Sequence, residues 1–325
     1  MEYTKLGRSG LLVSRLSLGT MNFGNVTDEK ESFAIMDRAL DAGINFFDTA
    51  NVYGGAGGHG RTEEIIGRWF AQGGGRRERV VLATKVYGDM ENEVDGPNGP
   101  RGLSAYKIRR HLEASLRRLQ TDHVELYQMH HVDRTVGWEE LWGAFEAAVN
   151  AGKIDYIGSS NFAARDLVKA QYEAKARHFL GLVSEQHKYN LLCRLPELEV
   201  LPAALEHGIG VIPWSPLAGG LLGGHAFEQR SGARANADRL DDATRKQLQD
   251  FSKAAHEAGL PEADLALAWT LHHPAVTAPI IGPRNVGQLD DALRVVGLDL
   301  QDDLLSRLDE IFPGPGGEAP QAYAW

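Results

Sequence analysis

The stretch Ile44-Asn45-Phe46-Phe47-Asp48-Thr49-Ala50-Asn51-Val52-Tyr53 decides how the rest of this chain is interpreted. It is a short apolar run that ends in a carboxylate, and a tyrosine follows five residues later. Helix-like segments lie on both sides of the run, as expected for a parallel strand that is buried on both faces. Asp48 therefore falls at a strand end, which suggests a functional site. A loop aspartate and a loop aromatic residue would give the same pattern, so the remaining strands must decide.

Length, charge and cysteine content limit the classes of protein to consider. The chain has 325 residues and a formal net charge of −10, from 34 Lys and Arg against 44 Asp and Glu. This acidic balance disfavours nucleic acid and anionic membranes as partners. The single cysteine, Cys193, excludes an internal disulfide framework and a cysteine-built zinc site. Without a signal-peptide pattern or an apolar run of about 18 residues, the sequence predicts a cytoplasmic protein.

Apolar runs alternate along the chain with longer segments of helical periodicity. We predict eight strands, at 16–19, 44–48, 80–85, 124–130, 154–159, 182–186, 210–214 and 276–281. We predict helices at 28–42, 61–70, 104–119, 138–151, 164–177, 198–207, 241–258, 261–272, 286–296 and 302–311, with Asp28 and Ser104 as N-caps. Such alternation is typical of an α/β fold in which eight parallel strands close into a (β/α)8 TIM barrel.

The remaining segments complete the predicted domain. The runs 3–5 and 11–14 are expected to form an N-terminal hairpin that plugs the bottom of the barrel. Two long loops, 87–102 and 217–240, are of a length that is usually functional or disordered. The glycines in 217–240 suggest a loop that closes over a bound cofactor. We expect one domain over 1–325, of which 313–325 is a flexible C-terminal tail.

Polar side chains stand where the predicted strands end. They are Asp48, Lys85, His130, Ser160, Asn161, Gln186 and Ser215. Tyrosine is a poor acid at neutral pH, but an ammonium group beside Tyr53 would favour its phenolate and lower its pKa. Asp48 would hold Lys85 charged, and a neutral His130 could orient a carbonyl group. Each residue alone has an ordinary structural explanation, whereas the set predicts proton donation to a carbonyl oxygen as a hydride reaches the carbon.

Several motifs support this interpretation. They are Leu18-Gly19-Thr20-Met21, Asn45-Phe46-Phe47-Asp48-Thr49-Ala50 through Tyr53, Thr84-Lys85, Tyr127-Gln128-Met129-His130, Ile157-Gly158-Ser159-Ser160-Asn161-Phe162, Gln186, Pro213-Trp214-Ser215-Pro216-Leu217 and Ile281-Gly282-Pro283-Arg284-Asn285. With these motifs the sequence resembles the aldo-keto reductase family over essentially its whole length. The resemblance implies a TIM barrel, NADPH bound without a Rossmann fold, and a catalytic tetrad of Asp48, Tyr53, Lys85 and His130.

The resemblance also implies how the cofactor is bound. Ser160, Asn161 and Gln186 would contact the carboxamide of the nicotinamide, and Trp214 would stack on its ring. The loop after the seventh strand would lie over the pyrophosphate, and Arg284 would bind the adenosine phosphate. The full set of implied cofactor contacts is Gly19, Thr20, Met21, Ser160, Asn161, Gln186, Trp214, Ser215, Pro216, Leu217, Gly219, Leu221, Gly282, Arg284, Gln288 and Asp291. Many members have arginine in place of Gln288 and asparagine in place of Ala292. A surface ion pair from Arg284 to Asp290 or Asp291 is the alternative for Arg284.

Three alternatives compete with a carbonyl reductase. Gly55-Ala56-Gly57-Gly58-His59-Gly60 matches the dinucleotide fingerprint of a doubly wound fold, although Asn51-Val52-Tyr53-Gly54 intervenes after the strand end at Asp48. A metal-dependent hydrolase could use His130, His131 and Asp133, but the first strand lacks paired histidines. Resemblance to potassium-channel β subunits allows an NADPH-binding regulatory subunit without turnover. The identity of the small carbonyl substrate, its stereochemistry and the oligomeric state cannot be predicted, because variable loops form the substrate walls.

Overall fold

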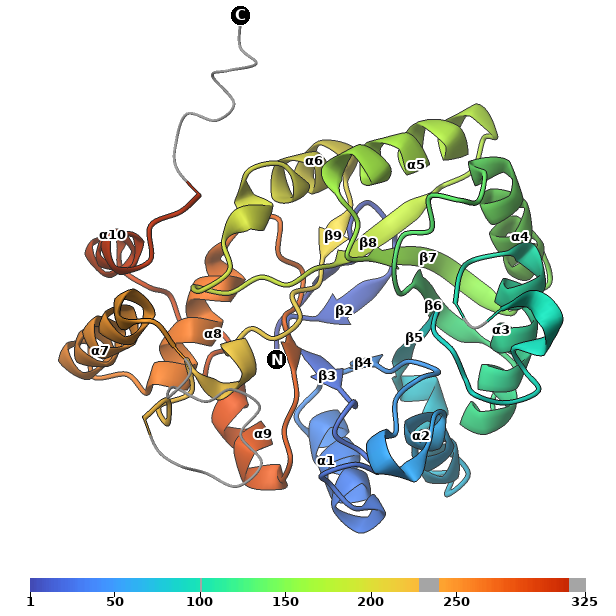
Figure 1. Cartoon of the computed structure of the whole chain (residues 1–325). Coiled ribbons are helices and arrows are strands. Elements are labelled where there is room, and N and C mark those ends of the chain that lie inside the picture. The colour runs from blue at the N-terminus through green and yellow to red at the C-terminus, as the bar shows by residue number, and fades with distance from the viewer. Residues whose placement is uncertain (100, 228–239, 316–325) are drawn as a thin grey trace, which may run out of the picture.

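The computed structural model describes residues 1–99, 101–227 and 240–315. Its main sheet has eight parallel strands in the order β10-β3-β4-β5-β6-β7-β8-β9. Their bounds are β3 Ser17–Gly19, β4 Phe46–Asp48, β5 Val81–Val86, β6 Val124–Met129, β7 Ile154–Ser160, β8 Leu182–Gln186, β9 Gly210–Val211 and β10 Ile280–Ile281. Figure 1 shows these strands as a ring with helices around it.

Backbone hydrogen bonds close the ring between β9 and the segment that leads into β10. The N–H of Val211 donates to Ala275 O at 3.0 Å, and the N–H of Thr277 donates to Val211 O at 2.8 Å. One step further along, the N–H of Ile280 donates to Pro213 O at 2.8 Å. Since β10 in turn pairs with β3, the predicted TIM barrel is confirmed.

Strands that neighbour each other from β3 to β9 also follow one another along the chain. A doubly wound sheet instead reverses its strand order at a switch point. The dinucleotide fingerprint suggested by residues 55–60 is therefore excluded. Gly55–Gly57 forms a short 3-10 turn, and Gly60 precedes the next helix with a φ of +88°.

The predicted N-terminal hairpin is confirmed and plugs one end of the barrel. β1 (Tyr3–Lys5) pairs antiparallel with β2 (Leu12–Ser14). Leu6 and Val13 are fully buried in a cluster with inward-facing strand residues such as Phe46. The turn fits tightly, because Gly7 has a φ of +55° and a Cβ there would lie 2.5 Å from the carbonyl oxygens of Gly208 and Val183. These contacts lie at the start of β8 and just before β9, so the plug closes the end opposite to the strand ends at Asp48 and Lys85.

Ten α-helices are described, and each falls within a predicted helical segment. They are α1 Glu29–Asp41, α2 Arg61–Phe70, α3 Ala105–Leu119, α4 Trp138–Asn150, α5 Ala164–Ala176, α6 Val200–His207, α7 Asp242–Glu257, α8 Glu262–His272, α9 Val286–Leu293 and α10 Asp302–Ile311. Asp28 and Ser104 are N-caps as predicted, since their side chains accept from the N–H groups of Glu31 and Lys107. In Figure 1, α7 and α10 lie side by side outside the ring, next to α8.

The last two strands are shorter than predicted. The prediction extended them over 210–214 and 276–281, whereas only Gly210–Val211 and Ile280–Ile281 are regular strand. Pro213 and Pro279 explain the difference, because proline has no N–H to donate to a sheet ladder. The segments still run side by side at the barrel mouth.

Parts of two predictions lie outside the described residues. They concern loop 217–240, of which 228–239 is not described, and tail 313–325, of which 316–325 is not described. Over the parts that are described, no helix is long and apolar enough to span a membrane. The assignment of 1–325 to one domain stays a prediction.

Candidate functional site

Three predicted catalytic residues are in direct contact at the carboxyl ends of β4 and β5. The Lys85 ammonium donates to Asp48 Oδ2 at 2.7 Å, to Thr49 O at 2.9 Å and to Tyr53 Oη at 3.1 Å. Lys85 is fully buried and Asp48 nearly so. An ammonium group has three hydrogens to donate. These three acceptors therefore satisfy it and fix its position against the tyrosine hydroxyl.

Lys85 stays protonated although it is buried, because these neighbours stabilise its positive charge. Burial alone would lower the pKa of Lys85, but the Asp48 carboxylate and then Tyr53 outweigh it, so that the pKa is raised. The ammonium form is thus the form present at neutral pH. A fixed positive charge beside a phenol stabilises the phenolate that remains after the phenol gives up its proton.

His130, the fourth predicted catalytic residue, stands beside the Tyr53 ring. The two rings meet edge to face, with centroids 5.9 Å apart. Burial, then Lys85 and then His131, which stacks on His130 at 5.3 Å, lower the pKa of His130 well below its usual value. A neutral imidazole can donate or accept one hydrogen bond at each nitrogen, depending on its tautomer. His130 is therefore able to orient a carbonyl group without adding a charge.

The residues predicted to bind the nicotinamide lie together next to this cluster. Asn161, with a φ of +60°, donates from Nδ2 to His130 O at 3.2 Å and accepts at Oδ1 from Trp214 Nε1 at 3.1 Å. Ser160 Oγ donates to the backbone oxygen of Gln186 at 2.9 Å. One asparagine therefore connects the end of β6 to the indole on which the ring was expected to stack.

Two other predicted cofactor residues support Asp48 in this structure. The hydroxyl of Thr20 donates to Asp48 O at 2.9 Å, and Thr20 is fully buried. Gln186 Nε2 donates to Asp48 Oδ1 at 2.8 Å. Gly19 lies directly against Ile280, where a Cβ would not fit, whereas Met21 is exposed. Support for the end of β4 is thus a role that the sequence did not assign to these residues.

The loop after β9 has the backbone expected of a phosphate-binding loop. Positive φ angles occur at Ser215 (+56°), Ala218 (+50°), Gly219 (+71°) and Gly220 (+109°). The N–H of Gly219 donates to Ser215 Oγ at 3.1 Å, and Asn190 Nδ2 donates to Ser215 O at 2.8 Å. Among the described residues no atom would lie within 4 Å of a Cβ on Gly220, so they leave this side of the loop open. Backbone turned in this way can present its amides to an anion. Pro216, Leu217 and Leu221, which were also predicted here, lie in the same loop.

The predicted adenosine-phosphate residues lie around the start of α9. The side chain of Gln288 accepts from the backbone N–H of Arg284 at 2.9 Å, and Asn285 caps the helix. Asp290 is paired with Arg38 at 2.7 Å, and Asp291 with Arg294. Both aspartates thus pair with arginines other than Arg284. Gly282 is close by, and its carbonyl accepts from Asn22 Nδ2 at 2.9 Å.

Gln128 is a site residue that the sequence reasoning missed. Its amide nitrogen donates to Asp48 Oδ1 at 3.1 Å from the middle of the barrel. The signal was present, because a glutamine at an inward position of the otherwise apolar run Tyr127-Gln128-Met129 must find a polar partner when it is buried. Lys188, also missed, lies over the Trp214 ring at 5.8 Å.

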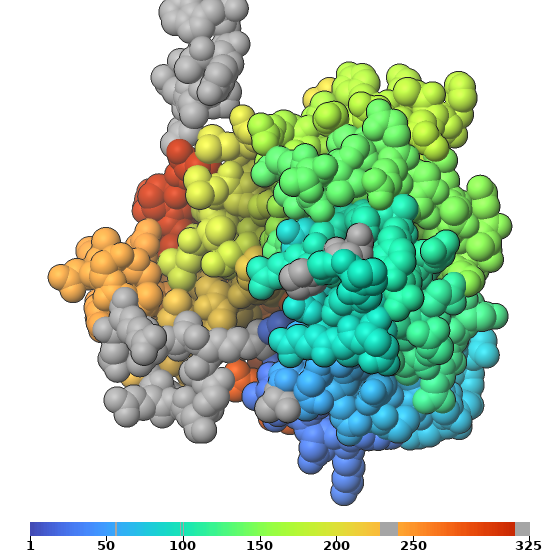
Figure 2. All heavy atoms as spheres, turned by 45° about the vertical axis from the view of Figure 1, so that its right-hand side comes forward, coloured from blue at the N-terminus to red at the C-terminus, as the bar shows by residue number. Residues whose placement is uncertain are grey.

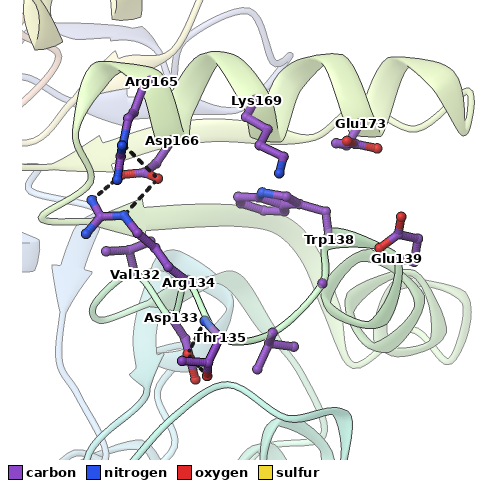
Figure 3. Close-up of a pocket in the computed structure, with 12 residues that line it drawn as sticks. Val132, Asp133, Arg134, Thr135, Trp138, Glu139, Arg165, Asp166, Lys169 and Glu173 are labelled. Carbon is purple, nitrogen blue, oxygen red and sulfur yellow. Dashed lines mark hydrogen bonds and ion pairs between the residues drawn. The ribbon is translucent and has the colours of Figure 1, made fainter.

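A hollow of about 480 Å³ lies near this site but does not contain it. It is lined by residues 132–139 and by Arg165, Asp166, Lys169 and Glu173 of α5. Figure 3 shows Arg134 and Arg165 both directed at Asp166, and Lys169 above the Trp138 ring. None of the four predicted catalytic residues lines it. Among the residues that the structure describes, no group of three or more His, Cys, Asp or Glu side chains is placed to hold a metal ion.

Known proteins are similar to this chain over the region that contains the site. A model of the aldo/keto reductase family matches residues 15–312. The uncharacterized oxidoreductase YrpG of Bacillus subtilis (strain 168) is 63% identical over 327 residues, with 100% of both chains covered. Versiconal hemiacetal acetate reductase of Aspergillus parasiticus is 32% identical over 338 residues, which cover 95% of this chain and 96% of that protein. A probable voltage-gated potassium channel subunit beta of Oryza sativa subsp. japonica is 36% identical over 310 residues, with 91% of each chain covered.

Proposed function

Because the chain belongs to the aldo/keto reductase family of oxidoreductases, we propose that it reduces an aldehyde or ketone to an alcohol with NADPH, and that Tyr53 is the general acid. One observation carries this proposal. The Lys85 ammonium donates both to a buried carboxylate, that of Asp48 at 2.7 Å, and to a phenol hydroxyl, that of Tyr53 at 3.1 Å. This arrangement suits a phenol that must release a proton at neutral pH.

The chain's own residues would handle the proton and the orientation of the substrate. NADPH would supply a hydride from C4 of its nicotinamide. The hydroxyl of Tyr53 donates its proton to the carbonyl oxygen, and the Lys85 ammonium at 3.1 Å stabilises the phenolate that is left. The neutral His130 imidazole holds the carbonyl oxygen toward Tyr53. Asp48 keeps Lys85 in place through the 2.7 Å contact.

The geometry of the cofactor residues supports nucleotide binding at the mouth. Asn161 and Trp214 would hold the nicotinamide, and the open loop of residues 215–221 would bind the pyrophosphate. We place the 2′-phosphate of NADPH at Arg284, next to the N-terminus of α9, because a guanidinium group and a helix N-terminus both attract an anion.

A titration of both nucleotides tests the phosphate assignment. Arg284→Ala should narrow the preference for NADPH over NADH by about 1.5 to 3 kcal/mol, the usual worth of a hydrogen bond to a charged group. The affinity for NADH should hardly change. Arg38→Ala is the matched control, since Arg38 pairs with Asp290 of the same helix and should affect both nucleotides equally. Equal losses of NADH and NADPH affinity in Arg284→Ala would contradict the assignment.

A second candidate is an NADPH-binding regulatory subunit without turnover, and the 36% identity to a potassium-channel β subunit favours it. Both candidates predict stoichiometric NADPH binding. Only the reductase predicts that a panel of aldehydes, ketones and sugars contains compounds that accelerate NADPH oxidation. Tight binding without turnover of any panel member would favour the regulatory subunit.

A further inference from the structure

The two oxygens of the Asp48 carboxylate have different partners. Oδ2 accepts from Lys85, whereas Oδ1 accepts from two amides, those of Gln186 at 2.8 Å and Gln128 at 3.1 Å. An ionised carboxylate can only accept hydrogen bonds, so the amide nitrogens must face it. The side of Asp48 that faces away from the lysine is therefore held by two donors from β6 and β8.

Gln128 binds Asp48 at a cost to the fold. With its nitrogen turned to Asp48, Gln128 Oε1 is buried and has no hydrogen-bond partner among the described residues. A buried acceptor without a partner destabilises the fold, because it has given up its hydrogen bonds to water. An apolar side chain of the same length would remove that cost and fill the same space, so packing alone does not account for a glutamine here.

The neighbouring strand makes room for this side chain. Gly158 pairs with Gln128 in the sheet register, and a Cβ on Gly158 would lie 3.0 Å from Gln128 Cγ. The same Cβ would collide with Ser184 Oγ on β8. A glycine at this position thus allows Gln128 to fold across the barrel toward Asp48.

We propose that Gln128 is a positioning residue that acts through Asp48 to hold Lys85 against Tyr53. This inference rests on the proposed function. Without Gln128, one donor fewer holds the carboxylate, which is freer to turn away from the ammonium. The negative charge of Asp48 is also less compensated at Oδ1, so it opposes more strongly the effect by which the Lys85 ammonium favours the Tyr53 phenolate. Of the titratable groups in this cluster, Lys85 from β5 contacts the carboxylate, Tyr53 from the loop after β4 contacts Lys85, and His130 at the end of β6 stands against the Tyr53 ring.

The variant Gln128→Met tests the proposal, since methionine is unbranched and of similar length. We expect kcat to fall about ten-fold, as for the loss of one hydrogen bond to a charged group, while the KM for the carbonyl substrate stays the same. The alkaline limb of the pH–rate profile should move upward by roughly half a unit to one unit, because Tyr53 would keep its proton to higher pH. Parental kcat and an unmoved limb would overturn the proposal.

Gln171→Met is the matched control. Gln171 is also a buried glutamine, and it exchanges two 2.9 Å hydrogen bonds with the backbone of Leu182, away from Asp48. Its loss should reduce stability but leave the pH–rate profile unchanged. If both variants moved the limb equally, the effect would be a general response of the barrel, and the proposal would fail.

Two further measurements keep the test decisive. If Gln128→Met does not fold, Gln128→Glu keeps the size of the side chain and places a carboxyl group against Asp48. Two carboxyl groups at this distance resist joint ionisation, so activity should be retained at low pH and fall as the new group ionises. A pH–rate profile like that of the parent would overturn the proposal.

An ultraviolet titration of the Tyr53 phenol, taken as parent minus Tyr53→Phe, needs no substrate. If the midpoint of this titration shifts in Gln128→Met but no carbonyl compound is turned over, the positioning role is supported and the proposed function is rejected. If the midpoint does not shift, the positioning role itself is rejected.

Discussion

Among the described residues two lysines are buried, and each lies beside an aspartate. Lys85 contacts Asp48 at 2.7 Å at the barrel mouth, and Lys107 contacts Asp95 at 3.3 Å between α3 and the loop after β5. Burial and pairing are thus alike in the two regions. What differs is the third group in contact with each pair.

The third group beside Lys85 is the Tyr53 hydroxyl, at 3.1 Å. Beside Lys107, the Asp95 carboxylate accepts from the N–H of Met90 at 2.9 Å and lies 3.2 Å from His111 Nε2, which is not aligned to donate to it. The other nitrogen of His111 meets Asn51 Nδ2 at 2.9 Å. The Lys107 cluster therefore ties the loop after β5 to the segment that leads to Tyr53.

In Figure 2 the teal surface around α3 lies above the light blue surface around α2, with which α3 is in contact. The described partners of Asp95 in the Lys107 cluster include the backbone amide of Met90 and His111, whose imidazole burial, and then Lys107, keep neutral by lowering its pKa to about 4. The comparison teaches that a buried Lys–Asp pair indicates a catalytic site only when it contacts a group that can react.

Removing Lys85 should have the largest effect on activity. In Lys85→Met the charge beside Tyr53 is lost, and we expect the reductase rate to fall about 10³-fold, in the range of general acid and electrostatic catalysis. NADPH binding, measured by fluorescence, should persist. Turnover within a few-fold of the parent would show that the ammonium is structural, like that of Lys107.

Removing Lys107 should instead affect stability. Lys107→Met leaves the Asp95 carboxylate buried without its ammonium partner, which typically costs about 3 kcal/mol or more of unfolding free energy. Urea denaturation measures this loss. At saturating substrate the rate should stay within a few-fold of the parent. A collapse of kcat with unchanged stability would remove the distinction between the two pairs.

His111 should make the Lys107 cluster sensitive to acid. Its pKa is lowered to about 4 by burial and then by Lys107, below the value of about 6.5 expected in the unfolded chain. Between these values the unfolded state binds the proton and the folded state does not, so stability is lost as pH falls through this window. His111→Gln should reduce the loss of unfolding free energy between about pH 7 and about pH 4.5 by roughly 2 kcal/mol. Denaturation at both pH values checks this, and an unchanged difference would mean that His111 is charged in the folded protein.

Much of this comparison could be predicted from the sequence, and part of it could not. Asp48, Lys85 and His130 stand at the ends of apolar runs, and parallel strands bring such ends together whatever the details of packing. Gln128 binds Asp48 across the barrel, and no local pattern states which buried group a strand glutamine will meet. The contact of Asp95 with His111 depends on how a proline- and glycine-rich loop packs on α3, which periodicity does not describe. The cytoplasmic location stays a prediction.

The central claim is that Tyr53 supplies the proton in a carbonyl reduction by NADPH. The most direct test is a single-turnover measurement on Tyr53→Phe, with the NADPH complex mixed rapidly with a substrate of the parent protein. We expect NADPH to bind as it does to the parent, because the ring still fills its place, and reduction to slow by about 10² or more. Reduction at the parental rate would contradict the claim, because a phenylalanine has no proton to give.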